Sequence, residues 1–235
     1  MQGKQWIFLA PCSNPAAQKH LSDTIVKGIK LTDIEQYLNE ADKRVLQTID
    51  ILRIWGNVPA KAKEWEDMEV GDVVLFYQLG SFTHAGKVSY KTENEELSKI
   101  LWPDFEDGKP WRYIYFLQET REVNIPLDLI RNFSGYDPGF IPMGFMSLRE
   151  KGIDAIVQKY GVLENFLKAH EVVSNQDDTD SQCLNLLKNI KADDLIEKYT
   201  SASTITKWTN ALKGFSARKK DESYDAWIAN TISCL

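Results

Sequence analysis

The sequence has little cysteine and little histidine, and their placement excludes the commonest sites built from them. Cys12, Cys183 and Cys234 lie far apart without a Cys-x-x-Cys pair, and the three histidines are equally scattered. Zinc sites and disulfide frameworks need closely and regularly spaced cysteines or histidines. We therefore expect no metal, no cofactor and no cysteine nucleophile.

Catalytic motifs are missing as well. The chain has no Gly-rich phosphate loop with Lys-Ser/Thr, no His-x-x-x-His pair and no Gly-x-Ser-x-Gly elbow. Asp193-Asp194 followed by Glu197-Lys198 has the wrong spacing for a nuclease set. The sequence therefore predicts a protein that is not an enzyme.

No long apolar run is present. No stretch approaches the roughly 20 residues of a membrane span. The start, MQGKQWIFLAPCSNP, lacks the basic flank and the apolar length of a signal peptide. We expect a cytoplasmic protein that makes no contact with membranes.

Basic residues are outnumbered. The chain has 28 Lys and Arg against 34 Asp and Glu, a net charge of −6. Lys and Arg contacts to phosphates supply most non-specific affinity for nucleic acid, so a general polyanion binder is excluded. If nucleic acid is the ligand, recognition must rest on a pocket with a local basic rim.

What is present is the composition of a folded domain with an appendage. A length of 235 residues with 43% hydrophobic residues provides a real core. Ser174–Ser181 is a linker by composition, and apolar residues at helical spacing follow it, with a basic triplet at Arg218–Lys220. We expect a domain over residues 1–170, then a linker and helical extension over 171–235.

Three patterns mark helix starts. Asn14 before Pro15 places a side-chain acceptor at the N-cap and a residue without a backbone donor at the first helical position. Gly28 is expected to end that helix. Thr32–Glu35 and Ser147–Glu150 have the capping-box pattern and predict two further helices.

Strands are indicated by β-branched and aromatic runs. Val73–Tyr77 reads as a buried strand that turns near Gly80 into a second strand, Phe82–Lys91. Alternate residues of that second strand are expected to share one face. Trp111–Leu117 and Glu122–Ile125 are expected to be two further strands.

Trp55 is the most informative aromatic residue. Ile54 and Trp55 end an apolar run, and Gly56-Asn57 break it. We expect the indole at the lip of a strand, with one aromatic face exposed.

These residues carry a resemblance to a known family. Ile54-Trp55-Gly56, Trp65, Gly71–Tyr77 and Gly86-Lys87-Val88 resemble, in this order, the EVE branch of the PUA-like superfamily. The LWPD…WRYIYFL and MGFMSLREKGI segments are similar to those of EVE-like reader domains in modification-dependent restriction systems. The resemblance spans about residues 5 to 165. It implies an α+β fold: a small, strongly bent β-barrel with flanking helices.

The resemblance also implies a function. Relatives, including YTH domains, hold a modified base in an aromatic pocket. This chain would then be a non-catalytic reader that flips a methylated base out of DNA, with the motor and nuclease of a McrBC-type system in other domains or subunits. Two alternatives stay open: a reader of modified RNA, or a protein-interaction scaffold without a base pocket.

The resemblance and the residue types together name a site. Trp55 is the first choice for a pocket wall, and the loop after Pro11 is the expected pocket edge, although Asn14 is equally explained as a plain helix cap. Each of the other aromatics is by itself more often a core residue, and each cation more often solvated surface. The predicted pocket residues are Trp55, Gly56, Asn57, Ser13, Asn14, Tyr77, Phe82, Trp102 and Phe145, with Trp6 and Trp111 competing as walls, and the predicted phosphate contacts are Lys61, Lys63, Lys87, Arg112 and Arg149.

Overall fold

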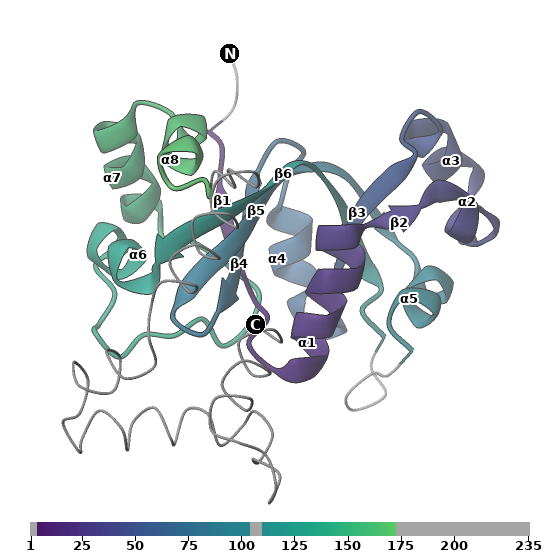
Figure 1. Ribbon diagram of the computed structural model, residues 1–235, viewed down its shortest axis with the longest axis horizontal. Coiled ribbons are helices and arrows are strands. Elements are labelled where there is room, and N and C mark those ends of the chain that lie inside the picture. Colours follow the sequence, from purple (N-terminus) through teal and green to yellow (C-terminus); the bar gives the residue numbers. More distant parts are fainter. Residues whose placement is uncertain (1–3, 104–109, 173–235) are drawn as a thin grey trace, which may run out of the picture. The chain divides into compact units, whose positions relative to one another are not determined.

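A computed structural model describes residues 4–103 and 110–172 of the chain (Figure 1). The predicted linker at Ser174–Ser181 and the helices beyond it lie outside these residues. Within them, no helix has both the length and the apolar character needed to cross a membrane.

The centre of the fold is one mixed sheet. Its strand order is β2-β3-β6-β5-β4-β1-β7. β1 pairs in parallel with β4, and the other neighbours are antiparallel. The strands are β1 (Ile7–Pro11), β2 (Ile29–Lys30), β3 (Ile51–Asn57), β4 (Val73–Gln78), β5 (Ser81–Glu93), β6 (Tyr113–Pro126) and β7 (Met146–Ser147).

Helices flank this sheet, which confirms the predicted α+β class; closure of the sheet into a barrel stays a prediction. Figure 1 shows α6, α7 and α8 together at one end of the sheet and α2, α3 and α5 at the other. The helices are α1 (Pro15–His20), the π-helix η1 (Leu21–Lys27), α2 (Leu31–Ile34), the 3-10 helices η2 (Glu35–Tyr37) and η3 (Pro59–Lys61), α3 (Glu40–Leu46), α4 (Ala62–Asp67), α5 (Glu95–Leu101), α6 (Leu127–Ser134), α7 (Glu150–Tyr160) and α8 (Leu163–Ala169).

The two faces of β4 contribute to different parts of the core. Val73, Leu75 and Tyr77 belong to a cluster that includes residues of α6, α7 and α8. Val74 and Phe76 belong to a second cluster, which includes residues of α1 and β3. This division is the alternation expected of a strand that is buried on both faces.

β5 does not alternate as predicted. Phe82 and Ala85 contribute to one core cluster and Val88 to the other, so Phe82 and Val88 do not share one face as expected. The pairing with β6 shifts register between Phe82 and His84, between Ala85 and Lys87, and between Val88 and Tyr90. Each irregularity changes the face toward which the following side chains point. The prediction that alternate residues of this strand share one face was therefore wrong.

β6 is one strand where two were predicted. It runs unbroken from Tyr113 to Pro126 and pairs with β3 near its start and with β5 along its length. Glu119, at φ 50, lies in the left-handed region inside the strand. The polar residues between the two predicted strands therefore belong to the strand itself.

The first predicted helix start is confirmed. The Asn14 side chain accepts a hydrogen bond from the Ala17 backbone N–H at 2.7 Å, and Pro15 is the first helical residue. The helix continues as the π-helix η1 and ends at Gly28, at φ 75.

The two predicted capping boxes are wrong. α2 begins directly after β2, so Thr32 already lies inside its first turn, and no side chain caps it. Ser147 lies in β7, where it pairs with Phe8 of β1, so its backbone is extended. The capping box in the structure is formed by Asn39 and Asp42 at the start of α3.

Candidate functional site

Trp55 is buried, contrary to the expectation of an exposed aromatic face. Its exposed fraction is 3%. β3 does not end at Gly56 but continues through Asn57, and Trp55 pairs with Tyr115 of β6. The edge of the indole meets Phe76, with 5.2 Å between the ring centroids. The strand continues through Gly56 because this glycine makes room for neighbouring side chains and does not form a turn.

Gly56 is required by two further tryptophans. A Cβ at this position would lie 2.5 Å from the Trp111 carbonyl oxygen and 2.7 Å from a ring carbon of Trp102. Trp55, Trp102 and Trp111 therefore pack together, with ring centroids 5.4–6.5 Å apart. His20 of α1 joins them, 5.4 Å from Trp111. We call these four residues the tryptophan cluster.

Buried polar atoms without partners lie at this cluster. Within the described residues, Asn57 Nδ2, Trp102 Nε1 and the Tyr115 hydroxyl have no hydrogen-bond partner. Asn57 lies two residues after Trp55 and Tyr115 lies opposite it, so their side chains share the face of Trp55. Burial, together with nearby Cys12, raises the pKa of Tyr115, so its hydroxyl stays protonated and can donate. Two donors therefore lie beside the Trp55 ring.

The start of α1 lies on the same side of the molecule as the end of β3. Arg53 Nη1 donates to the carbonyl oxygen of Ile25 at 2.8 Å, and His20 packs on Trp111, whose carbonyl faces Gly56. The helix thus runs antiparallel along β3, and its first turn lies at the level of the β3 end. This arrangement brings Ser13 and Asn14 to the side of the molecule where β3 ends at Asn57.

Both residues already have local partners there. The Asn14 carboxamide oxygen caps α1, and the Ser13 hydroxyl accepts a hydrogen bond from the Leu79 N–H at 3.3 Å. Their role as a pocket edge stays a prediction.

Phe145 belongs to the same core cluster as Trp55 and Tyr115. Its ring stacks on Phe8 at 5.4 Å and lies 5.7 Å from the ring of Tyr115. The loop before it folds back on the domain, and Gly144 passes beside Lys61, with 3.2 Å from its ideal Cβ position to Lys61 Cε.

Tyr77 and Phe82 lie elsewhere. They belong to the core cluster that includes residues of α6, α7 and α8, on the face of β4 opposite to Phe76. The Tyr77 hydroxyl accepts from the Gly80 N–H at 3.1 Å and so braces the β4–β5 turn. The structure does not bring these two aromatics to Trp55.

The predicted phosphate contacts all have partners within the domain. Lys87 is the most enclosed, with 18% of its side chain exposed between Glu119 and Glu164, which weighs against a phosphate role. Lys61 lies beside Gly144, next to Phe145, and Arg149 lies against the start of the same loop. The partners are Glu64 for Lys61, Asp67 for Lys63, Glu119 and Glu164 for Lys87, Glu93 for Arg112, and the Gly135 carbonyl with the Tyr136 ring for Arg149.

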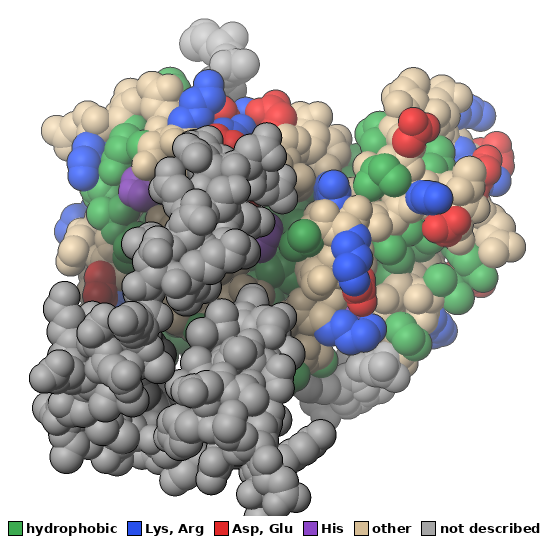
Figure 2. Space-filling model, in the orientation of Figure 1, with side chains coloured by type: hydrophobic (Ala, Val, Ile, Leu, Met, Phe, Trp, Pro, Cys, Tyr) green, Lys and Arg blue, Asp and Glu red, His purple; other side chains and the backbone are tan. Residues whose placement is uncertain are grey.

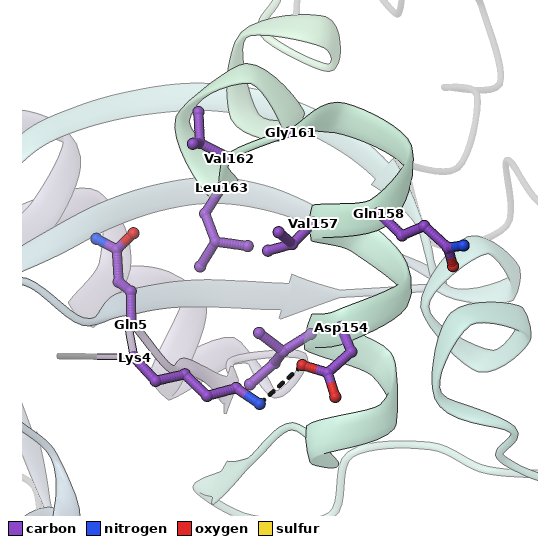
Figure 3. A pocket seen from close by; sticks show the side chains of 9 residues that line it. Lys4, Gln5, Asp154, Val157, Gln158, Gly161, Val162 and Leu163 are labelled. Carbon is purple, nitrogen blue, oxygen red and sulfur yellow. Dashed lines mark hydrogen bonds and ion pairs between the residues drawn. The ribbon is translucent and has the colours of Figure 1, made fainter. Parts of the chain in front are cut away.

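A surface hollow of about 560 Å³ lies apart from these aromatics (Figure 3). Lys4 and Gln5 line one side of it, and residues of α7 and the turn into α8 line the other. Lys4 makes an ion pair with Asp154 at 2.7 Å across it. None of the nine lining residues is aromatic, so this hollow is not the predicted base pocket.

The described residues around the cluster contain neither a reactive thiol nor a group of metal ligands. The Cys12 thiol donates to the Tyr77 carbonyl at 3.2 Å, and burial raises its pKa to about 12, so it carries no nucleophilic thiolate. In the part of the chain that the structure describes, no three His, Cys, Asp or Glu side chains are grouped to hold a metal.

Sequence reasoning did not find His20 or Tyr115. His20 is buried at 8% exposure, and nothing near it in the sequence marks it as an aromatic partner. Tyr115 matters because of the β3–β6 register, which local sequence does not encode.

No protein-family model and no curated protein matches the sequence. Among solved structures, the fold is similar to one described as the N-terminal domain of Thermococcus gammatolerans McrB bound to m5C DNA, with a TM-score of 0.53 and 17% identity. The match covers 69% of this chain and 99% of that one. The two chains share a fold.

Proposed function

We propose that this protein reads a modified base in DNA as the recognition part of a modification-dependent restriction system. A methylated base, flipped out of the duplex, would stack in the tryptophan cluster and be read by Asn57 and Tyr115. A separate domain or subunit would supply the motor and the nuclease. The fold supports this proposal, because it matches nearly the whole of a domain that is bound to m5C DNA.

The observation that carries the proposal is the pair of buried donors beside Trp55. Asn57 Nδ2 and the Tyr115 hydroxyl have no partner among the described residues. An unsatisfied buried donor costs about 1–3 kcal/mol, and folded proteins rarely keep one without a reason. The ring edge of a base offers the acceptors that these donors lack.

Entry of a base requires the cluster to open. Trp55 and Trp102 are 3% and 0% exposed, whereas Trp111 is only half-buried. We therefore infer that Trp111 moves aside and that Trp55 becomes the stacking surface. Stacking returns roughly 1–3 kcal/mol per base, which is comparable to the few kcal/mol that flipping costs.

Selectivity must come from more than the methyl group. Burying one methyl contributes only about 0.8 kcal/mol, roughly a fourfold preference. Hydrogen bonds to the base edge discriminate more strongly, because a wrong base leaves the buried donors unpaired. Asn57 is therefore the residue on which base preference depends most.

Surface charge fits a reader of low non-specific affinity. Over α1 and η1, basic side chains alternate with acidic ones (Figure 2), and Lys19 and Lys27 both pair with Asp23. Many of the cations in the described part of the chain are held in ion pairs within the domain, so we expect affinity to fall only shallowly with salt.

The test is a titration of the protein with duplexes that differ only in one C5-methylcytosine, beside an RNA strand of the same sequence. Wild type should prefer the methylated duplex. Asn57→Leu should keep the melting temperature, because it removes an unpartnered donor, and lose about tenfold or more in affinity. Ser134→Ala is the matched control, since it removes another buried unpartnered group, on α6.

Three results would contradict the proposal. Equal affinity for plain and methylated duplexes would exclude a reader of this base. Binding of modified RNA alone would select the RNA-reader alternative. A protein that binds no nucleic acid would leave the scaffold as the explanation.

A further inference from the structure

The turn between β4 and β5 carries a residue that its backbone does not favour. Leu79 and Gly80 both have positive φ, 43 and 100. Positive φ at both central residues is the pattern of a type I′ hairpin turn, which favours Asn and Gly and disfavours an aliphatic side chain. The Leu79 side chain is also 82% exposed. Neither turn geometry nor core packing therefore explains a leucine here.

This turn lies beside the loop that leads into α1, which is the expected edge of the pocket. β1 and β4 run in parallel, so the turn and the loop into α1 lie at the same end of the sheet (Figure 1). The Leu79 N–H donates to the Ser13 hydroxyl at 3.3 Å, and the Cys12 N–H donates to the Tyr77 carbonyl at 2.8 Å. The turn is therefore fastened to the loop that leads into α1.

The turn is also braced. The Gly80 N–H donates to the Tyr77 hydroxyl at 3.1 Å, and the Tyr77 ring packs on Phe82 at 5.4 Å within the core. A braced hairpin tip holds its outermost side chain in one direction. For Leu79 that direction is toward solvent.

We propose that Leu79 is a wedge that enters the base stack of duplex DNA where the flipped base has left it. This inference rests on the proposed function. A flipped base leaves a gap between its neighbours, and apolar side chains such as leucine are inserted between base steps by proteins that distort the duplex. A leucine in this gap recovers apolar contact that the departing base has lost.

Met143 is the competing residue. It is 90% exposed and precedes Gly144, which passes beside Lys61. Its backbone is ordinary, so no unfavourable conformation needs to be offset at this position. Leu79 is therefore the stronger assignment, and Met143 serves as the comparison.

The experiment measures binding of Leu79→Asn to a duplex with one C5-methylcytosine and to the same methylated strand alone. Asparagine suits the turn, so the melting temperature should stay equal or rise. Affinity for the duplex should fall about tenfold, equivalent to about 1.4 kcal/mol. Affinity for the single strand should not change, since it has no stack to fill. Leu79→Gly, which also tolerates positive φ, should behave in the same way.

Val70→Asn is the matched control. Val70 is 66% exposed and precedes Gly71, at the opposite end of β4. Its substitution should leave both affinities unchanged.

The outcomes separate the two proposals. If wild type prefers methylated duplex but Leu79→Asn binds it equally well, the wedge is overturned and the proposed function stands. Equal losses on duplex and single strand also overturn it, as does a duplex-specific loss in Met143→Asn alone. If wild type shows no preference for methylated DNA, the proposed function fails and the wedge fails with it.

Discussion

At the scale of single residues, Gly56 determines how the tryptophans pack. Its missing side chain lets the Trp111 carbonyl and the Trp102 ring approach the β3 backbone. The sequence motif around Trp55 was therefore informative, but its physical meaning was different. Glycine in a strand can mark a break or a close approach, and only the surrounding side chains decide which.

Gly56→Ala should be strongly destabilising. The new Cβ would lie 2.5 Å from a backbone oxygen, which cannot rotate away. We expect a loss of about 1–3 kcal/mol in the free energy of unfolding, measured by chemical denaturation. Gly139→Ala is the control, because no atom lies within 4 Å of its Cβ position. Equal stability of the two variants would show that the tryptophan packing is not as described.

Trp55→Ala tests burial of the indole directly. A ring that is 3% exposed and in contact with Phe76 and two tryptophans leaves a cavity when it is removed. We expect a loss of roughly 3–5 kcal/mol in unfolding free energy. A variant that melts like wild type would show that the ring is a free wall of the site, as first expected from the sequence.

His84 makes stability depend on pH. Burial lowers its pKa below the ordinary value of 6.5, although Glu122 acts in the opposite direction. The unfolded chain therefore takes up a proton before the folded one does. The contribution of His84 is present above pH 6.5 and is lost as pH falls from there through the folded-state pKa. Denaturation of wild type and His84→Gln at about pH 7.5 and about pH 5.5 should show a smaller acid loss in the variant. An equal loss in both proteins would exclude His84 as the source.

At the scale of elements, α8 is attached to the sheet by charge. Glu164 of α8 pairs with Arg121 of β6 at 2.9 Å and with Lys87 of β5 at 3.0 Å. Arg121 also meets Glu171 at 3.4 Å, and its side chain is only 13% exposed. Although desolvation opposes them, Lys87 and Arg121 lower the pKa of Glu164, so its carboxylate stays ionised.

Arg121→Met should loosen this attachment. It removes the cation that Glu164 and Glu171 share and leaves Glu164 with Lys87 and Lys168, so we expect a loss of about 1–3 kcal/mol in unfolding free energy. Lys63→Met is the control, because its pair with Asp67 is 80% and 59% exposed and should contribute close to nothing. Equal melting curves for the two variants would refute a structural role for the network.

Elements were predictable where local chemistry defines them. Asn14-Pro15 marked the start of α1 correctly, and Gly28, at φ 75, ended the helix where it was expected. The register shifts of β5 and the continuity of β6 were not predictable, because both depend on partner strands that are distant in the sequence. Tyr115 was not predicted as a site residue for the same reason, because its position depends on the register between β3 and β6.

At the scale of the whole molecule, the α+β class followed from the family resemblance that the motifs carry. The pocket did not, because the predicted residues divide between the two faces of β4. Tyr77 and Phe82 lie on one face, and Trp55 lies on the other. Residue type identified aromatics, but only the three-dimensional arrangement assigned them to a face.

The boundary of the predicted domain can be tested by truncation. The Val172 N–H donates to the Glu122 carbonyl at 3.0 Å, and Glu171 forms a bridge with Val123. A chain ending after Val172 should therefore melt cooperatively and keep its preference for methylated DNA, whereas a cut after His170 removes both contacts. Loss of the cooperative melt in the longer fragment would show that residues beyond Val172 complete the fold.

The parallel pairing of β1 with β4 has a consequence for synthesis on the ribosome. Ile7–Ala10 is fully apolar and buried, and its partners Val73–Phe76 and Met146–Ser147 are translated much later. At about 5–20 residues per second, this hydrophobic strand waits several seconds for its first partner. During translation, the nascent chain thus exposes an apolar strand whose backbone hydrogen-bonding groups are unpaired. A chaperone that binds short apolar segments would find its first target there.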